Sequence, residues 1–236
     1  MPSSSFCSIS RLLKPFTKIY AWVVLSFLCA QIAYAVSVDT KSYNPSSGVV
    51  VKVVGKTLVI GWDTPEGSSE FTLNLSGQGA LVRSIAVAAG KGKPVEVIRD
   101  IDPVTVLTVG QRDLNKRSGW TIFFDRTSRR PSESGPLTLK LKSAIVRSVG
   151  RRCMVDLGEL QGKSFSGKLR FTVYAGCDLI HLQSVVQTKE DARALLYHAG
   201  LTCDPVSKAV SWIGLDDKVH RVDAAAQSAE PEKVRH

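Results

Sequence analysis

Short runs that alternate apolar and polar residues fill most of the chain, and a turn signal ends nearly every run. In "KPVEVIRD" and "PVTVLTVG" the two kinds of residue alternate with the period of a strand that has one buried face. Glycine, proline or an Asp-Pro turn closes such runs. The spacing of apolar residues that an amphipathic helix needs is almost absent. The chain is therefore predicted to be all-β, as a mainly antiparallel β-sandwich.

Two segments refine this prediction. The stretch "GVVVKVVGKTLVIGW" holds two β-branched runs around Gly55-Lys56 and predicts a hairpin. The stretch "TKEDARALLYHA", residues 188–199, breaks the strand pattern, and Thr188 with Asp191 forms a short-acid variant of the capping box. One short helix at most is expected here, with extended structure over "ARALLYHAG" as the alternative.

The N-terminus has the three parts of a secretory signal peptide. A basic start is followed by an apolar run over residues 21–30 and by the A-x-A cleavage site Ala33-Tyr34-Ala35. The apolar run is shorter than the roughly 20 residues of a membrane-spanning helix, which makes an uncleaved anchor the weaker alternative. Residues 1–35 are therefore predicted to be removed, and the mature protein to be secreted or periplasmic without stable membrane insertion.

Cleavage would leave 201 residues and lower the formal charge from +10 to +7, because the removed segment has three basic and no acidic residues. We expect a β-sandwich domain over residues 36–222 and a disordered tail over residues 223–236, where most residues are small or charged. A basic secreted protein can bind nucleic acid, an acidic polysaccharide or an anionic surface. No basic block exceeds two residues and no stacking aromatics accompany one, so nucleic acid is not expected as a partner.

Three cysteines would remain after cleavage, namely Cys153, Cys177 and Cys203. An odd number in an oxidising compartment allows one internal disulfide at most, and three buried, inert cysteines are the slightly preferred interpretation. The chain has no CxxC motif and no ligand spacing typical of zinc, so neither a metal nor any other cofactor is expected. The disulfide pairing and the oligomeric state stay open.

The ribbon "KLRFTVYAGCDLIHLQSV", residues 168–185, carries the most distinctive polar residues. If it turns at Gly176-Cys177, antiparallel partners keep a constant index sum, and Arg170 faces Gln183. The core face is then Leu169, Phe171, Val173, Ile180 and Leu182. The polar face is Arg170, Thr172, Tyr174, His181 and Gln183.

Planar hydrogen-bonding groups beside an aromatic ring suit the hydroxyls and C–H faces of a sugar. The candidate carbohydrate-binding residues are Arg170, Tyr174, His181 and Gln183. An ordinary solvated sheet face is the alternative.

Two basic loops, residues 111–119 and 126–135, flank a strand predicted over Trp120–Asp125. In the second loop, arginine forks can clamp a carboxylate such as that of a uronic acid. Candidate anion-binding residues are Arg126, Arg129 and Arg130, with a solvated loop as the alternative.

Catalysis is permitted by the composition, but no catalytic residue is assigned. A lyase acting on an acidic sugar needs a base and a positive charge for the enolate, and His181, Tyr174 and Arg170 have that chemistry. A glycosidase needs two carboxylates that face each other across the bond, and the adjacent Glu190 and Asp191 fit this poorly.

The segment "GKLRFTVYAGCDLIHLQSVVQTKEDARALLYHAGL", residues 167–201, resembles secreted bacterial β-sandwich proteins related to the galactose-mutarotase-like supersandwich, as found in exo-rhamnogalacturonan lyase-like and other polysaccharide-degrading proteins. The similar feature is a strand of type R-F-x-x-Y-A-G followed by one of type L-I-x-L-x-x-V. The resemblance implies a large sandwich whose concave face contacts a glycan, with Arg170 and Tyr174 as motif members. Such relatives carry further catalytic domains, so a stand-alone binding module, a truncated product or a subunit is expected here.

The leading hypothesis is a secreted carbohydrate-binding β-sandwich, for which an acidic polysaccharide would suit the basic charge. The first alternative is a polysaccharide lyase or glycosidase-related domain that uses the same face. The second alternative is a structural or adhesion domain of the cell envelope, in which that face has no ligand.

Overall fold

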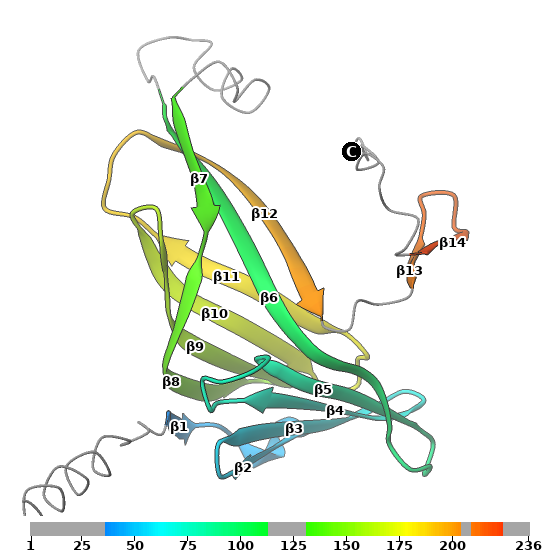
Figure 1. Ribbon diagram of the computed structural model, residues 1–236. Helices are drawn as coiled ribbons and strands as arrows, with labels where there is room; N and C mark the ends of the chain where they lie inside the picture. The colour runs from blue at the N-terminus through cyan, green and yellow to red at the C-terminus, as the bar shows by residue number, and fades with distance from the viewer. Residues whose placement is uncertain (1–35, 113–130, 204–208, 224–236) are drawn as a thin grey trace, which may run out of the picture. The chain divides into compact units, whose positions relative to one another are not determined.

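The computed structural model describes residues 36–112, 131–203 and 209–223, and these form strands in three sheets (Figure 1). Sheet A has five strands in the order β1-β8-β9-β10-β11. These are β1 (Ser37–Ser42), β8 (Thr138–Val149), β9 (Arg152–Gly162), β10 (Phe165–Tyr174) and β11 (Ile180–Gln187).

Sheet B has seven strands in the order β12-β6-β5-β4-β3-β2, with β7 also paired to β6. These are β2 (Val49–Val54), β3 (Thr57–Thr64), β4 (Gly67–Asn74), β5 (Val82–Ala89), β6 (Val95–Gln111), β7 (Ser132–Pro136) and β12 (Arg193–Cys203). The third sheet is the hairpin of β13 (Ala209–Ile213) and β14 (Val219–Asp223). The one helical turn in the described ranges is the 3-10 element η1 (Pro45–Ser47).

The prediction of a mainly antiparallel all-β fold is confirmed. Every strand pair is antiparallel except β1 and β8, which run parallel. Sheets A and B pack face to face through one core, as in a sandwich, and Phe71 of sheet B meets Phe171 of sheet A with ring centroids 5.1 Å apart. Other buried members of this core are Val49, Leu58, Ile60, Trp62, Leu73, Val82, Ala144, Val146, Val155, Leu157, Leu169 and Val173.

Both predicted hairpins form. Gly55 turns the first, between Val54 and Thr57, with a positive φ of 58° that suits glycine. The turn between β10 and β11 is fixed to sheet B, because the indole Nε1 of Trp62 donates to the carbonyl of Cys177 at 2.7 Å and the amide of Gly176 donates to the carbonyl of Asp63 at 2.9 Å. These two bonds hold the hairpin against the opposite sheet.

The turn predicted at Asp102-Pro103 does not form, and β6 passes through both residues. The carbonyl of Thr105 accepts from the amide of Leu137, so Thr105 directs its backbone away from β12. Pro103, two residues earlier, points the same way. Its missing N–H therefore removes no hydrogen bond to β12, and the strand tolerates the proline.

The helix considered for residues 188–199 does not form, and the extended alternative does. The hydroxyl of Thr188 accepts from the amide of Glu190 in a local turn. From Arg193 onward the chain pairs with β6, which satisfies the backbone groups of every second residue and packs Leu195 against Val109. Tertiary pairing thus overrides the local helix preference.

Several predictions concern residues that the structure leaves undescribed. They are the signal peptide (1–35), the strand over Trp120–Asp125 with most of its flanking loops, and all of the predicted tail after Asp223, which itself ends β14. Residues 132–135 of the second predicted loop belong to β7 instead. In the described ranges no helix has the length and apolar character needed to cross a membrane.

Candidate functional site

The hairpin of β10 and β11 has the predicted register. Arg170 pairs with Gln183 and Thr172 with His181, while Phe171 and Leu182 turn to the other side. Leu169, Phe171 and Val173 are buried in the core, and Ile180 and Leu182 pack against it. The polar set therefore lies on the face of sheet A that points away from sheet B, which we call the outer face.

The polar residues on this face differ in their exposure. Thr172 is buried, Tyr174 is half-buried, and His181 and Gln183 are exposed. The side chains of Tyr174, His181 and Gln183 make no hydrogen bond to any described residue, which leaves their polar groups free for a ligand. The side chain of Arg170 is only 19% exposed, and its guanidinium is already engaged.

The guanidinium of Arg170 is bound to Asp156 on β9, a residue that the sequence analysis did not single out. Arg170 is paired with Asp156 across the two strands, and its guanidinium donates from Nε at 2.6 Å and from Nη2 at 3.2 Å to the two carboxylate oxygens. Such a bidentate pair fixes both side chains. Asp156 has a side chain only 4% exposed, so Arg170 positions a buried carboxylate.

Two more cations share this carboxylate. The Nζ of Lys168 lies 2.7 Å from Oδ2 of Asp156, and Nη2 of Arg147 on β8 lies 3.3 Å from the same oxygen. The Nε of Arg147 is buried without a hydrogen-bond partner. Three cations therefore surround one anion, and this Asp156 cluster keeps a surplus of positive charge.

The cluster holds Asp156 ionised. Burial raises the pKa of Asp156, but the hydrogen bonds from Arg170 and Lys168 and their charges outweigh burial, and the pKa lies below its ordinary value. The hydrogen bond to Asp156 raises the pKa of Arg170 in turn. The carboxylate acts as an internal counter-ion that gathers the three cations on one face.

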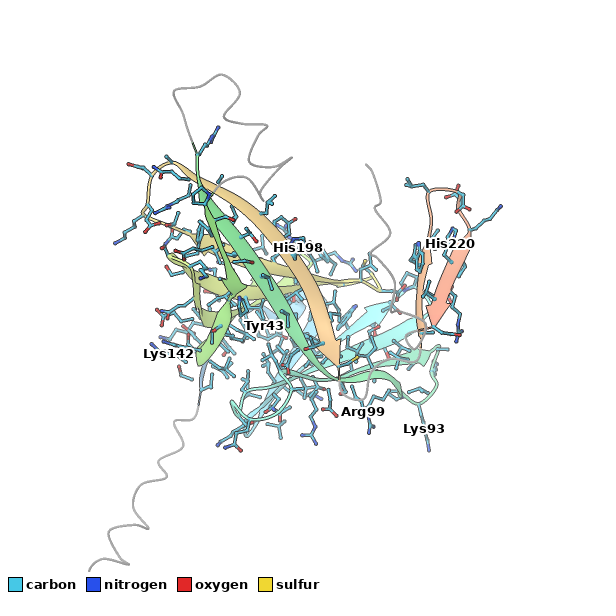
Figure 2. The ribbon with its side chains drawn as sticks, turned by 45° about the horizontal axis from the view of Figure 1, so that its top comes forward. Tyr43, Lys93, Arg99, Lys142, His198 and His220 are labelled. Atoms are coloured by element: carbon cyan, nitrogen blue, oxygen red, sulfur yellow. The ribbon has the colours of Figure 1, made fainter. Side chains whose placement is uncertain are left out.

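Further basic residues extend this face along β8 and β9. Lys142, labelled in Figure 2, pairs with Glu159 at 2.9 Å, and the pKa of Glu159 is lowered by that hydrogen bond. Lys140 and Arg152 are exposed nearby in the same strands, and Arg152 lies opposite Tyr174. The outer face is thus basic over three neighbouring strands.

Among the described residues considered for a site, Glu190 and Asp191 lie away from this cluster. Arg126, Arg129 and Arg130 lie outside the described residues. Glu190 forms an ion pair with Arg193 at 2.7 Å and lies beyond the C-terminal end of β11, whereas His181 lies at its start. An eight-residue strand spans about 27 Å, so the carboxylates at 190 and 191 are far from His181.

The three cysteines of the described residues form no disulfide and differ in burial. Cys153, Cys177 and Cys203 are all free, and only Cys153 is fully buried, so the interpretation of three buried cysteines is wrong for two of them. Burial raises the pKa of the Cys153 thiol to about 11, which makes it unreactive. No group of three His, Cys, Asp or Glu side chains within the described ranges is arranged to hold a metal ion.

The hairpin of β13 and β14 holds a second group that sequence reasoning missed. The rings of Trp212 and His220 stack at 5.5 Å with planes 15° apart, and Nε2 of His220 lies 2.9 Å from the carboxylate of Asp216. That hydrogen bond is the main cause of the lowered pKa of Asp216. Only the register of the hairpin places Trp212 opposite His220, so the sequence carried no signal for it.

The chain matches no family model, no curated protein and no solved structure in the three comparisons made. The arrangement of the outer face must therefore be interpreted from its own chemistry.

Proposed function

We propose that this protein is a secreted carbohydrate-binding β-sandwich that binds an acidic polysaccharide on the outer face of sheet A. The observation that carries the proposal is the Asp156 cluster, in which Arg147, Lys168 and Arg170 share one buried carboxylate. Its surplus of positive charge attracts an anionic polymer. The N-terminal pattern of a signal peptide supports the proposed location outside the cytoplasm.

The neighbouring side chains supply the contacts that a sugar needs. Tyr174 offers a ring for stacking on a sugar face, and His181 and Gln183 offer hydrogen-bonding groups without a described partner. In this proposal Tyr174, His181 and Gln183 contact the carbohydrate. Arg170, which was expected to contact the sugar as well, instead holds the Asp156 cluster together. A polymer rather than a small ligand fits a basic face that extends over several strands.

We propose binding rather than a lyase or glycosidase activity. The lyase hypothesis needs a cation that is free to hold the enolate, and Arg170 is already bound by both carboxylate oxygens of Asp156. The hydrolase hypothesis needs paired carboxylates, and Asp156 is surrounded by cations instead.

The test is affinity gel electrophoresis with polygalacturonate, and with neutral dextran as the reference polymer. We expect retardation by polygalacturonate alone, and Tyr174→Ala to weaken it about five-fold, from a stacking contribution of about 1 kcal/mol. Tyr174→Phe keeps the ring and is expected to keep most of the binding. Circular dichroism establishes that each variant is folded.

Trp212→Ala is the matched control, because it removes an exposed aromatic ring outside sheet A. Equal retardation of the parent and of Tyr174→Ala would remove Tyr174 from the site. Loss of binding in Trp212→Ala alone would place the site on the β13–β14 hairpin. Absence of retardation by every acidic polysaccharide tested would refute the proposal.

A further inference from the structure

Strand β12 lies at an edge of sheet B. It pairs with β6 along its whole length, from Arg193 opposite Gln111 to Cys203 opposite Ile101, and no other described strand pairs with it (Figure 1). An unpaired strand edge presents a row of backbone donors and acceptors that can accept a further strand. The edge is eleven residues long, about twice a typical strand.

The hydrogen-bonding pattern of β6 shows which residues of β12 face this free edge. Thr105 directs its carbonyl toward Leu137, away from β12, so its partner Ala199 directs its own amide and carbonyl away from β6. Alternate residues behave alike. The residues whose backbone groups point to the free edge are Leu195, Tyr197, Ala199 and Leu201.

The side chains in the middle of this set, Tyr197, Ala199 and Leu201, are exposed, whereas Leu195 packs against the core. Tyr197 is 70% exposed and Leu201 is 58% exposed, although Leu107, directly opposite Tyr197, is 1% exposed. One strand thus separates the buried Leu107 from the open Tyr197 in the middle of β12, whereas Leu195 and Cys203 toward its two ends pack against the core. The free backbone groups and the free apolar side chains occur together.

This edge lacks the features that usually prevent strand addition. From Ala194 to Cys203 there is no proline and no charged residue, and the only titratable side chain before Cys203 besides that of Tyr197 is His198, labelled on β12 in Figure 2. The opposite edge of sheet B has Lys52 in the middle of β2. At one edge of sheet A, β1 is short and holds Asp39 and Lys41, and at the other edge β11 has eight residues against the eleven of β12. Lysines and short strands discourage edge-to-edge pairing.

We propose that β12 pairs in antiparallel fashion with β12 of a second copy of this chain. The argument is electrostatic. The chain carries a formal charge of +10, and its outer face on sheet A is basic, so two copies repel each other over most approaches. The β12 edge is a long stretch where two copies meet without bringing like charges together.

A twofold axis at Ala199 makes the pairing self-complementary. Ala199 then lies opposite Ala199 of the second copy, and Tyr197 lies opposite Leu201 in two equivalent pairs. All these residues already direct their backbone N–H and C=O groups to the free edge, so in this register the groups of the two copies can form hydrogen bonds with each other. Tyrosine opposite leucine is a favourable cross-strand pair, and the two sheets B become one continuous sheet.

The experiment is sedimentation velocity of the purified full chain over a wide concentration range. We expect a reversible monomer and dimer equilibrium. Ala199→Lys places two lysines directly opposite each other and is expected to raise the dissociation constant of the dimer at least about tenfold. The matched control is Val54→Lys on β2, an exposed apolar edge position, which is expected to leave the equilibrium unchanged.

A second variant tests the register without repulsion. In Ala199→Cys the two thiols lie across the axis at a Cα separation of about 5.5 Å, within the range for a disulfide. We expect a disulfide-linked dimer under mild oxidation, and none from Val54→Cys or from the parent with its own five cysteines.

A monomer at all concentrations would overturn the proposal. In that case, protection of the Tyr197 and Leu201 amides from hydrogen exchange would show that another part of the same chain covers β12. A dimer that persists in folded Ala199→Lys, without crosslinking in Ala199→Cys, would also overturn it and place the interface elsewhere.

Discussion

The outer face of sheet A and the free edge of β12 show two ways in which this chain leaves strand residues uncovered. On the outer face, a buried carboxylate, Asp156, gathers three cations, and each of them has a partner. On β12, the side chains of Tyr197 and Leu201 are 70% and 58% exposed. The first surface is charged and its cations share a counter-ion, whereas the second is neutral and has unpaired backbone groups. Surfaces of these two kinds favour different partners, an anionic polymer and another strand.

The largest expected effect comes from Asp156→Ala. Removal of the carboxylate leaves Arg147, Lys168 and Arg170 close together without their counter-ion. Breaking a buried ion pair on one side costs about 3 kcal/mol where the remaining cations are partly exposed, and urea unfolding at neutral pH measures it. Glu159→Ala on the same face is the control, because its pair with Lys142 is exposed, and a much smaller loss is expected. Equal losses in both variants would show that the cluster has no special role.

A smaller effect is expected from pH, because the pKa of Asp156 is lowered in the folded protein. A group with a lowered folded pKa contributes stability that is fully present above its unfolded pKa of about 4 and is lost as the pH falls through the folded pKa. Urea unfolding between pH 7 and pH 2 should therefore show a loss below pH 4 that is reduced in Asp156→Asn. An identical pH profile for the parent and the variant would separate the acid response from this cluster.

The smallest effect is expected from salt, and it should have opposite signs at the two surfaces. Added sodium chloride screens the attraction between the outer face and polygalacturonate, so retardation in the affinity gel should weaken. The same screening reduces the repulsion between two basic copies, so dimerisation through β12 should strengthen. Gel retardation and sedimentation at low and moderate ionic strength measure the two responses. Responses of the same sign would contradict the contrast between a charged and a neutral surface.

The hairpin that carries the candidate site could be predicted from the sequence, because the register follows from one turn. The placement of Arg170, Tyr174, His181 and Gln183 on one face is confirmed, while their role in carbohydrate binding stays a prediction. The rule that paired residues of an antiparallel hairpin keep a constant sum of residue numbers fails between β9 and β10, where it predicts the wrong partner for Asp156. From Phe165 opposite Gly162, that rule would place Asp156 opposite Phe171.

The register between β9 and β10 shifts after Gly167, where Glu159 is an extra residue on β9, and Asp156 therefore lies opposite Arg170. A shift of one residue moves a side chain to the other face of the sheet, so the bulge decides whether the carboxylate meets cations or the core. The alternation of Cys153, Val155 and Leu157 did indicate that Asp156 belongs to the polar face. It did not indicate which residues would surround it.

The sequence by itself determined the all-β class, most of the strands and the registers of the short hairpins, because a period of two and a tight turn are local properties. The tertiary structure decided the surroundings of Asp156, the passage of β6 through Pro103 and the exposure of Tyr197. Each of these depends on strands distant in the sequence: on a bulge between β9 and β10, on the side to which Pro103 points, and on the place of β12 at the edge of sheet B. Burial and charge pairing arise only when such strands meet, and no local pattern encodes that meeting.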